Sequence, residues 1–229
     1  MGQSIAEKII AKAAGKKTVQ TGEIVTCAVD LAMIHDSGGP RRVKPAMEKL
    51  GVGVWDPAKI VLVSDHFAPC TDAESAAILK LTREWEAEQG ILNFYDQQGI
   101  CHVVTPERGH LAPGMFAVGG DSHSPTGGAF GCYMFGIGAT DMLGVLVTGE
   151  TWIKVPETIR INWSGQLGTG LAAKDMALKM CATLGMDGGG YQAIQYAGET
   201  IRNLDMLERM TLCNMAAELG AQAGIIEPD

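Results

Sequence analysis

The sequence has no long apolar run, no closely spaced cysteines and few aromatic side chains. No stretch reaches the roughly 18 uninterrupted apolar residues that a membrane-spanning helix needs, and no secretory apolar core follows the first residues. The six cysteines lie at least 31 positions apart, so none forms the C-x-x-C pair of a zinc ribbon or a self-contained iron–sulfur motif. These absences indicate a cytoplasmic protein with reduced thiols and no membrane partner.

Positive charge is also scarce, which argues against polyanionic partners. The chain carries 18 lysines and arginines against 26 aspartates and glutamates, a formal net charge of −8. Such a charge repels nucleic acid and anionic membrane surfaces on average. The 30 glycines and 9 prolines are scattered without a period, which excludes collagen-like, coiled-coil and low-complexity structure. With 229 residues, 46% of them apolar, the chain is long enough to bury a sizeable core.

Short apolar runs alternate with amphipathic stretches along the chain. Ser4 and Glu7 have the spacing of a capping box, so a helix is expected from there to Gly15. A glycine-spaced apolar segment runs from 127 to 149. Strands are expected at 23–30, 60–64, 100–104, 115–118 and 154–163, and helices at 72–89, 174–184 and 206–219. The alternation predicts a layered α/β fold with short, mostly parallel strands flanked by helices, and no repeat or linker marks an internal boundary.

All five histidines lie within the first 123 residues, and three of them are adjacent or nearly adjacent to an aspartate. The pairs are His35-Asp36, Asp65-His66 and Asp121-Ser122-His123, while His102 and His110 flank Glu107. Polar residues that follow apolar strands gather at the carboxyl ends of a sheet, where open α/β folds bind ligands. An aspartate beside a histidine fixes the ring tautomer and raises its basicity, which suits general acid–base catalysis. One such pair is commonly a solvated surface dipeptide, but three at separate strand ends favour an active site.

Two further segments carry polar groups that suit a ligand site. The glycines between 119 and 128 allow the backbone to approach a ligand closely, and Ser122 offers a hydroxyl to an anionic substrate. Asn214 and Glu218 stand four residues apart, so on a helix they share one face. An amide and a carboxylate so placed can order water or a metal ion, although a polar patch at a helix end has the same spacing.

Six segments of the chain, taken together and in order, carry a resemblance. They are G-Q-S-I-A-E-K-I at 2–9, V-D-L-A-M-I-H-D at 29–36, V-S-D-H at 63–66, G-I-C-H-V-V-T-P-E at 99–107, G-D-S-H-S-P-T-G-G-A-F-G at 120–131 and M-T-L-C-N-M-A-A-E-L-G-A at 210–221. The chain resembles the aconitase superfamily, specifically the large subunits of two-subunit 3-isopropylmalate dehydratases. The resemblance implies a hydro-lyase of leucine biosynthesis that acts on a small 2-hydroxy di- or tricarboxylic acid, such as 3-isopropylmalate.

The same resemblance implies roles for the acidic and histidine pairs. Asp65 and His66 correspond to the pair that handles the leaving hydroxyl, with His66 as its proton donor. His102 corresponds to an active-site histidine whose partner is Asp121. In such enzymes a base removes a proton from the adjacent carbon, water leaves, and water adds again in the other orientation.

Further implied roles concern the substrate and an iron–sulfur cluster. His35 stands where relatives carry a substrate-contacting histidine or glutamine, and Ser122 is expected to contact the substrate carboxylate or the cluster environment. His123 is expected near the labile iron of a 4Fe–4S cluster, held by Glu218, with Asn214 supporting the cluster sulfides. In the family, that open iron binds the substrate as a Lewis acid.

The chain departs from the family in three respects. The family's large subunits are much longer, and their three cluster cysteines lie in the part with no counterpart here, so no cysteine of this chain is an expected ligand. The serine base belongs to a separate swivelling domain or small subunit. Ser37-Gly38-Gly39-Pro40 replaces a V-T-[SG]-P type segment, which leaves the identity of the substrate open. We therefore expect residues 1–229 to be the N-terminal portion of a truncated large subunit that needs a small subunit or a chain carrying the missing half.

Two other functions use the same residues. A metal-dependent hydrolase would take its ligands from Asp121, His123, His66 and Glu218. A non-catalytic remnant would fold without turning over a substrate. Without a partner, we expect the chain to bind no cluster, to expose apolar surface around Ile225 and Ile226 and along part of 127–149, and to self-associate.

Overall fold

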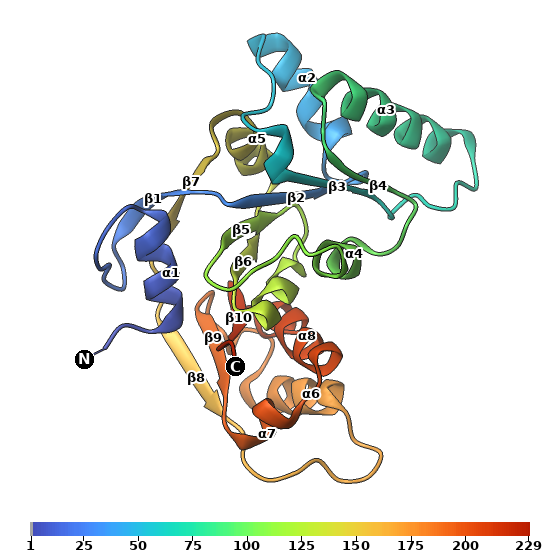
Figure 1. Cartoon of the computed structure of the whole chain (residues 1–229). Coiled ribbons are helices and arrows are strands. Elements are labelled where there is room, and N and C mark those ends of the chain that lie inside the picture. Colours follow the sequence, from blue (N-terminus) through green and yellow to red (C-terminus); the bar gives the residue numbers. More distant parts are fainter. Residues whose placement is uncertain (1) are drawn as a thin grey trace.

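The structure, a computed structural model, describes residues 2–229. Its largest sheet has five parallel strands in the order β4-β3-β2-β5-β6 (Figure 1). The strands are β2 Leu31–His35, β3 Ile60–Ser64, β4 Asn93–Asp96, β5 Phe116–Gly119 and β6 Tyr133–Gly136. Every residue of β2, β3 and β5 is buried, as is typical of parallel strands that helices cover on both faces.

Helices pack on both sides of this sheet. Figure 1 shows α2, α3 and α5 together on one side and α4 on the other. The helical elements of this part are α1 Ile5–Ala13, α2 Pro40–Leu50, η1 Pro57–Lys59, α3 Ala73–Gln89, α4 Cys101–Glu107 and α5 Ala139–Thr148. The expected capping box between Ser4 and Glu7 begins α1. Asp72 begins α3 by accepting a hydrogen bond from the amide of Ser75, and Gly90 ends that helix in the left-handed conformation.

A smaller sheet lies toward the C-terminus. Its parallel strands β8 Thr158–Asn162, β9 Ala193–Ala197 and β10 Ala223–Ile226 have the order β10-β9-β8. The helical elements α6 Ala173–Leu184, α7 Glu199–Asn203, α8 Met206–Asn214 and η3 Ala217–Leu219 accompany this sheet. The short helix η2 Ser124–Phe130 packs against β6, β10 and α8, so it joins the two sheets. β1 Ile24–Ala28 and β7 Glu150–Lys154 form a separate antiparallel ribbon.

The expected α/β fold with parallel strands and flanking helices is confirmed, but three expected elements differ in detail. Residues 100–104 begin helix α4 rather than form a strand, because a short apolar run suits a buried helix equally well. The expected strand at 154–163 is the end of β7 followed by β8, with Pro156 between them, since proline cannot donate to a strand ladder. The expected helix at 206–219 ends at Asn214. The apolar segment 127–149 contains the end of η2, then β6 and α5.

Ile225 and Ile226 are buried, which contradicts the expectation that they are exposed. Both lie in β10, with exposed fractions of 0% and 3%. The reason is that β9 pairs with β10 while α8 and η2 pack against it. The exposed large apolar side chains include Ile24 and Trp152 of the β1–β7 ribbon instead. Within residues 2–229, no helix is long and apolar enough to cross a membrane.

Candidate active site

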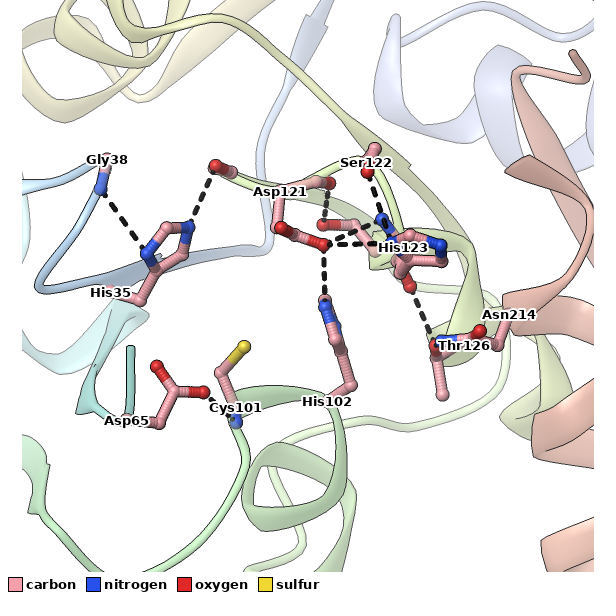
Figure 2. A network of polar contacts seen from close by, with 12 residues as sticks. His35, Gly38, Asp65, Cys101, His102, Asp121, Ser122, His123, Thr126 and Asn214 are labelled. Atoms are coloured by element: carbon pink, nitrogen blue, oxygen red, sulfur yellow. Dashed lines mark hydrogen bonds and ion pairs between the residues drawn. The ribbon is translucent and has the colours of Figure 1, made fainter. Parts of the chain in front are cut away.

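The acidic and histidine pairs meet at the carboxyl end of the five-stranded sheet. His35 is the last residue of β2, the Asp65–His66 pair follows β3, and the loop with Asp121 follows β5. Because β2 pairs with both β3 and β5 in parallel, these three segments leave the sheet at the same edge. Figure 2 shows that His102, which comes from α4, points toward the carboxylate of Asp121.

His35 is a buried, neutral ring with both nitrogens in use. The amide of Gly38 donates to its Nδ1 at 3.3 Å, and its Nε2 donates to the carbonyl oxygen of Gly120 at 3.0 Å (Figure 2). Burial lowers the pKa of His35, and the nearby His66 lowers it further. His35 therefore links the loops that follow β2 and β5, and neither of its nitrogens is free for a substrate.

Asp65 orients His66 and also ties the site to α4. Its Oδ1 accepts a hydrogen bond from Nδ1 of His66 at 2.6 Å, and its Oδ2 accepts one from the amide of Cys101 at 2.7 Å. Burial opposes ionisation of this carboxyl, but the hydrogen bonds from Cys101 and His66 outweigh burial and hold the pKa of Asp65 below its ordinary value. The proton on Nδ1 leaves Nε2 of His66 as the nitrogen that faces away from Asp65.

Asp121 connects His102 to the backbone of the loop that carries His123. Its Oδ1 accepts hydrogen bonds from Nε2 of His102 and from the amide of His123, both at 2.7 Å. The hydrogen bond from His102 is the main reason that the pKa of Asp121 lies well below its ordinary value; burial opposes the shift and the His123 amide adds to it. A fixed carboxylate at this point holds the ring of His102 by Nε2.

His123 is held on both sides of its ring. Its Nε2 donates to Oε1 of Glu218 at 3.2 Å, and the hydroxyl of Ser122 lies 3.1 Å from its Nδ1. The side-chain amide of Asn214 donates to the hydroxyl of Thr126 at 2.9 Å, and Thr126 lies in η2 just after His123. Asn214 ends α8 and Glu218 lies in η3, so the expectation that they share one helical face is wrong, yet both reach the loop that carries His123.

The four histidines at this edge differ in which nitrogens are free. Both nitrogens of His35 and both of His123 have partners. His66 uses only Nδ1 and His102 uses only Nε2 in the contacts of residues 2–229. The free Nε2 of His66 and the free Nδ1 of His102 are therefore the ring nitrogens that can exchange a proton with a bound molecule.

The structure brings together all of the residues proposed for the site from the sequence, and it gives contacts there to Asp36, named only as the neighbour of His35, and to Thr126. Those singled out are His35, Asp65, His66, His102, Asp121, Ser122, His123, Asn214 and Glu218. Asp36 binds the backbone just after β3, and Thr126 binds Asn214. In the sequence, the only indication for Asp36 was its position next to His35. Nothing in the sequence distinguished Thr126 from other loop residues.

Among the described residues, the side chains with metal-binding atoms do not form the site that the alternative hydrolase function requires. Within residues 2–229, the one group of three or more whose ligand atoms lie within 4.8 Å of one another is His35, Asp36, Asp65 and His66. Both nitrogens of His35 and both oxygens of Asp36 are already hydrogen-bonded. The set of Asp121, His123, His66 and Glu218 is not such a group in this part of the chain, so the geometry gives no support to the metal-dependent hydrolase.

Comparison with known proteins identifies the family of the chain. The model of the aconitase family (aconitate hydratase) matches residues 7–229. The chain belongs to the aconitase family. It is 47% identical over 231 residues to 3-isopropylmalate dehydratase large subunit 1 of Methanopyrus kandleri, covering 100% of this chain and 55% of that protein.

Other relatives have related names and similar coverage. The probable methanogen homoaconitase large subunit of Methanothermobacter thermautotrophicus is 46% identical, covering 99% of this chain and 54% of that protein. The 3-isopropylmalate dehydratase large subunit of Aquifex aeolicus is 44% identical, covering 100% of this chain and 53% of that protein. The chain thus spans about half the length of the curated relatives it matches.

Membership of the aconitase family implies a 4Fe–4S cluster, but the cysteines of this chain do not fit one. Within the described residues, no three cysteines form a metal-binding group. Cluster ligands are thiolates, whereas burial raises the pKa of Cys27 to about 11 and that of Cys132 to about 12. Burial likewise raises the pKa values of Cys101 and Cys213 far above the ordinary range. Within residues 2–229, the cysteines therefore offer no converging set of thiolates for a cluster.

Proposed function

We propose that this chain provides the proton-handling part of a hydro-lyase active site that acts on a small 2-hydroxy di- or tricarboxylic acid. Membership of the aconitase family, together with the acid–histidine pairs at one sheet edge, carries the proposal. The printed names of the relatives support 3-isopropylmalate as the first substrate to test and homoaconitate as the second. In this view residues 1–229 correspond to the N-terminal portion of such a large subunit.

His66 is proposed as the proton donor to the leaving hydroxyl. Loss of water from a 2-hydroxy acid requires a proton at the departing oxygen, because hydroxide is a poor leaving group. Asp65 fixes the Nδ1 proton of His66, so a proton taken up at Nε2 is the one that can be delivered. The carboxylate of Asp65 stabilises the positive ring that exists before the transfer and takes no proton itself.

His102 and His123 are proposed to surround the reacting carbon atoms. Asp121 holds His102 by Nε2, so Nδ1 is proposed as the nitrogen that exchanges a proton. Glu218 and Ser122 hold both nitrogens of His123, so this ring contributes shape and hydrogen bonding rather than proton transfer. The hydroxyl of Ser122 and the loop glycines are proposed to contact the substrate carboxylate, and His35 to support the site without touching the substrate.

The cluster and the carbon base are proposed to come from elsewhere. Because the cysteines of this chain do not converge, any 4Fe–4S cluster of the active enzyme takes its ligands from residues outside it. The relatives are named large subunits, which supports a small-subunit partner. A region or chain that corresponds to the remaining length of the relatives is the second proposed partner.

The test combines the 229-residue chain with a complementary polypeptide that carries cluster cysteines and with a small subunit, under anaerobic reconstitution. Dehydration of 3-isopropylmalate, homoaconitate and 2,3-dimethylmalate is then measured. Turnover of at least one acid is expected, with kcat about 10²- to 10⁴-fold lower in His66→Gln. His110→Gln is the matched control, because His110 bonds Tyr95 outside the site and should leave kcat unchanged.

Two outcomes would overturn the proposal. Absence of turnover in every combination, with a folded chain, would favour a non-catalytic remnant. Stoichiometric zinc or manganese in the purified chain, together with hydrolytic activity lost in His66→Gln, would favour the metal-dependent hydrolase.

A further inference from the structure

Asp36 is a fully buried carboxylate that contacts the residues next to His66. Its exposed fraction is 0%. Its Oδ1 accepts a hydrogen bond from the amide of His66 at 3.1 Å, and its Oδ2 accepts one from the amide of Phe67 at 3.0 Å. The amide of Asp36 itself donates to the carbonyl oxygen of Val63 in β3. Asp36, which directly follows β2, therefore binds both the end of β3 and the turn that follows β3.

A buried carboxylate is unfavourable unless strong hydrogen bonds replace its water. Here the chain leaves β3 at Ser64, and the next backbone N–H groups have no strand to pair with. Asp36 receives two of them, one on each oxygen, and this two-point contact fixes the position and direction of the turn. A single acceptor would leave the turn free to rotate about one hydrogen bond.

The turn held by Asp36 determines where the ring of His66 lies. The rings of His35 and His66 are stacked, with centroids 3.9 Å apart and planes within 10° of parallel. Nδ1 of His66 lies 2.6 Å from Asp65 and 3.8 Å from Oδ1 of Asp36. Asp65 fixes the rotation of the ring, His35 fixes its plane, and Asp36 fixes the backbone from which the ring extends.

We infer that Asp36 is a positioning residue for His66. It acts through the amides of His66 and Phe67 rather than by touching the substrate, and it keeps Nε2 of His66 aimed at the leaving hydroxyl. The catalytic part of this inference rests on the function proposed above, whereas the positioning part concerns only this chain. Misplacement of a reacting group by about 1 Å costs about 10²-fold in rate, so loss of one hydrogen bond can matter to turnover.

The test compares Asp36→Asn with Asp30→Asn in the 229-residue chain. Asp30 precedes β2 and accepts a hydrogen bond from the amide of Phe116 at 2.9 Å. Its substitution therefore also removes a carboxylate that accepts a backbone hydrogen bond, but at the opposite end of β2 from Asp36. An asparagine at position 36 can accept one amide and opposes the second with its own N–H₂. Histidine side-chain NMR should show the ring protons of His66 shifted in Asp36→Asn, as the ring leaves the face of His35, and unchanged in Asp30→Asn.

A second measurement on the unmodified chain covers the case in which Asp36→Asn does not fold. The amide protons of His66 and Phe67 should exchange with solvent at least ~10-fold more slowly than that of the exposed Thr71. Equal exchange rates would overturn the inference, as would unchanged His66 ring signals in a folded Asp36→Asn variant.

Turnover separates this inference from the proposed function. In the complemented enzyme, kcat should fall about 10- to 100-fold in Asp36→Asn with little change in KM, and Asp30→Asn should retain kcat. If the unmodified enzyme has no dehydratase activity but the NMR and exchange results hold, the proposed function fails and the positioning role stands. Normal kcat in Asp36→Asn in an active enzyme would overturn the positioning role alone.

Discussion

The imidazole ring of His66 lies flat on that of His35, with centroids 3.9 Å apart and planes within 10° of parallel. Two positively charged rings at this distance would repel each other. His35 avoids this because it is buried and neutral, with Nδ1 accepting from Gly38 and Nε2 donating to Gly120. The two rings thus differ in their contacts, since both nitrogens of His35 have partners whereas Nε2 of His66 has none within residues 2–229.

The first prediction concerns acid sensitivity that comes from His35. Burial lowers the pKa of His35 in the folded chain below the ordinary 6.5, so the unfolded chain binds a proton more readily. The stability that the neutral ring contributes is present above 6.5 and is lost as the pH falls from there toward the folded value, at up to about 1.4 kcal/mol per pH unit. Urea denaturation measures the free energy of unfolding of wild type and of His35→Gln. The difference between the two free energies should shrink as the pH falls over that interval.

Glutamine is the matched substitution in this experiment, because its amide can accept from Gly38 and donate to Gly120 without titrating. If the difference in unfolding free energy stays constant across the interval, His35 is not held neutral by the fold. His35 would then not be the neutral member of the stacked pair.

The second prediction concerns Asp121, whose pKa lies below its ordinary value of 3.8, chiefly because His102 donates to it. A lowered carboxyl pKa adds stability above the unfolded value, and that stability is lost as the pH falls through the folded value. Asp121→Asn should lower the free energy of unfolding by about 1.5–3 kcal/mol at neutral pH, and the loss should shrink below pH 3.8. The exposed Asp141 provides the control, since Asp141→Asn should leave the unfolding free energy nearly unchanged.

Much of this site could be predicted from the sequence because its residues follow apolar strands. The run at 60–64 is apolar throughout and short, so a buried parallel strand with Asp65 and His66 at its carboxyl end was a direct inference. The Asp121 loop follows the strand near 115–118 for the same reason. Parallel pairing then makes convergence a consequence of topology rather than of any single motif.

Other features could not be predicted because they depend on partners far along the chain. The resemblance implies that His102 pairs with Asp121, but not that His102 lies on helix α4, because a short apolar run suits a strand and a buried helix equally well. Asp36 stands beside His35 in the sequence, but its contact with the amides of the turn after β3 depends on the pairing of β2 with β3. The burial of Ile225 could not be predicted either, because it depends on the packing of η2 against β10, which lie far apart in the sequence.

The third prediction is that the 229-residue chain alone retains no 4Fe–4S cluster. Most of its cysteines are buried and free, no three of them form a metal-binding group within the described residues, and burial opposes the thiolate form that binds iron. After anaerobic reconstitution and desalting, iron and acid-labile sulfide should be absent from the chain, while the same treatment of a complementary polypeptide with cluster cysteines should leave both. A stable brown chain with iron and sulfide in equal amounts would contradict the prediction.

The last prediction concerns the junction between the His123 loop and the smaller sheet. Gly128 of η2 lies so close to β10 that a Cβ placed there would stand 1.7 Å from the carbonyl oxygen of Gly224. The obstacle is backbone, so it cannot move aside as a flexible side chain does. Because η2 follows His123 directly, its seating on β10 also sets the distance from His123 to Glu218.

Gly128→Ala should therefore lower the free energy of unfolding by about 2–4 kcal/mol and disturb the His123 ring signals, because β10 and η2 must separate. Gly144 is the matched control, since it lies inside α5 with open space around the site of a Cβ. Gly144→Ala should raise the unfolding free energy by about 0.4–1 kcal/mol, because alanine restricts the unfolded chain and favours helix. Urea denaturation measures both, and histidine NMR follows His123. A Gly128→Ala variant as stable as wild type, with His123 unchanged, would show that the junction tolerates separation and does not set the geometry of the site.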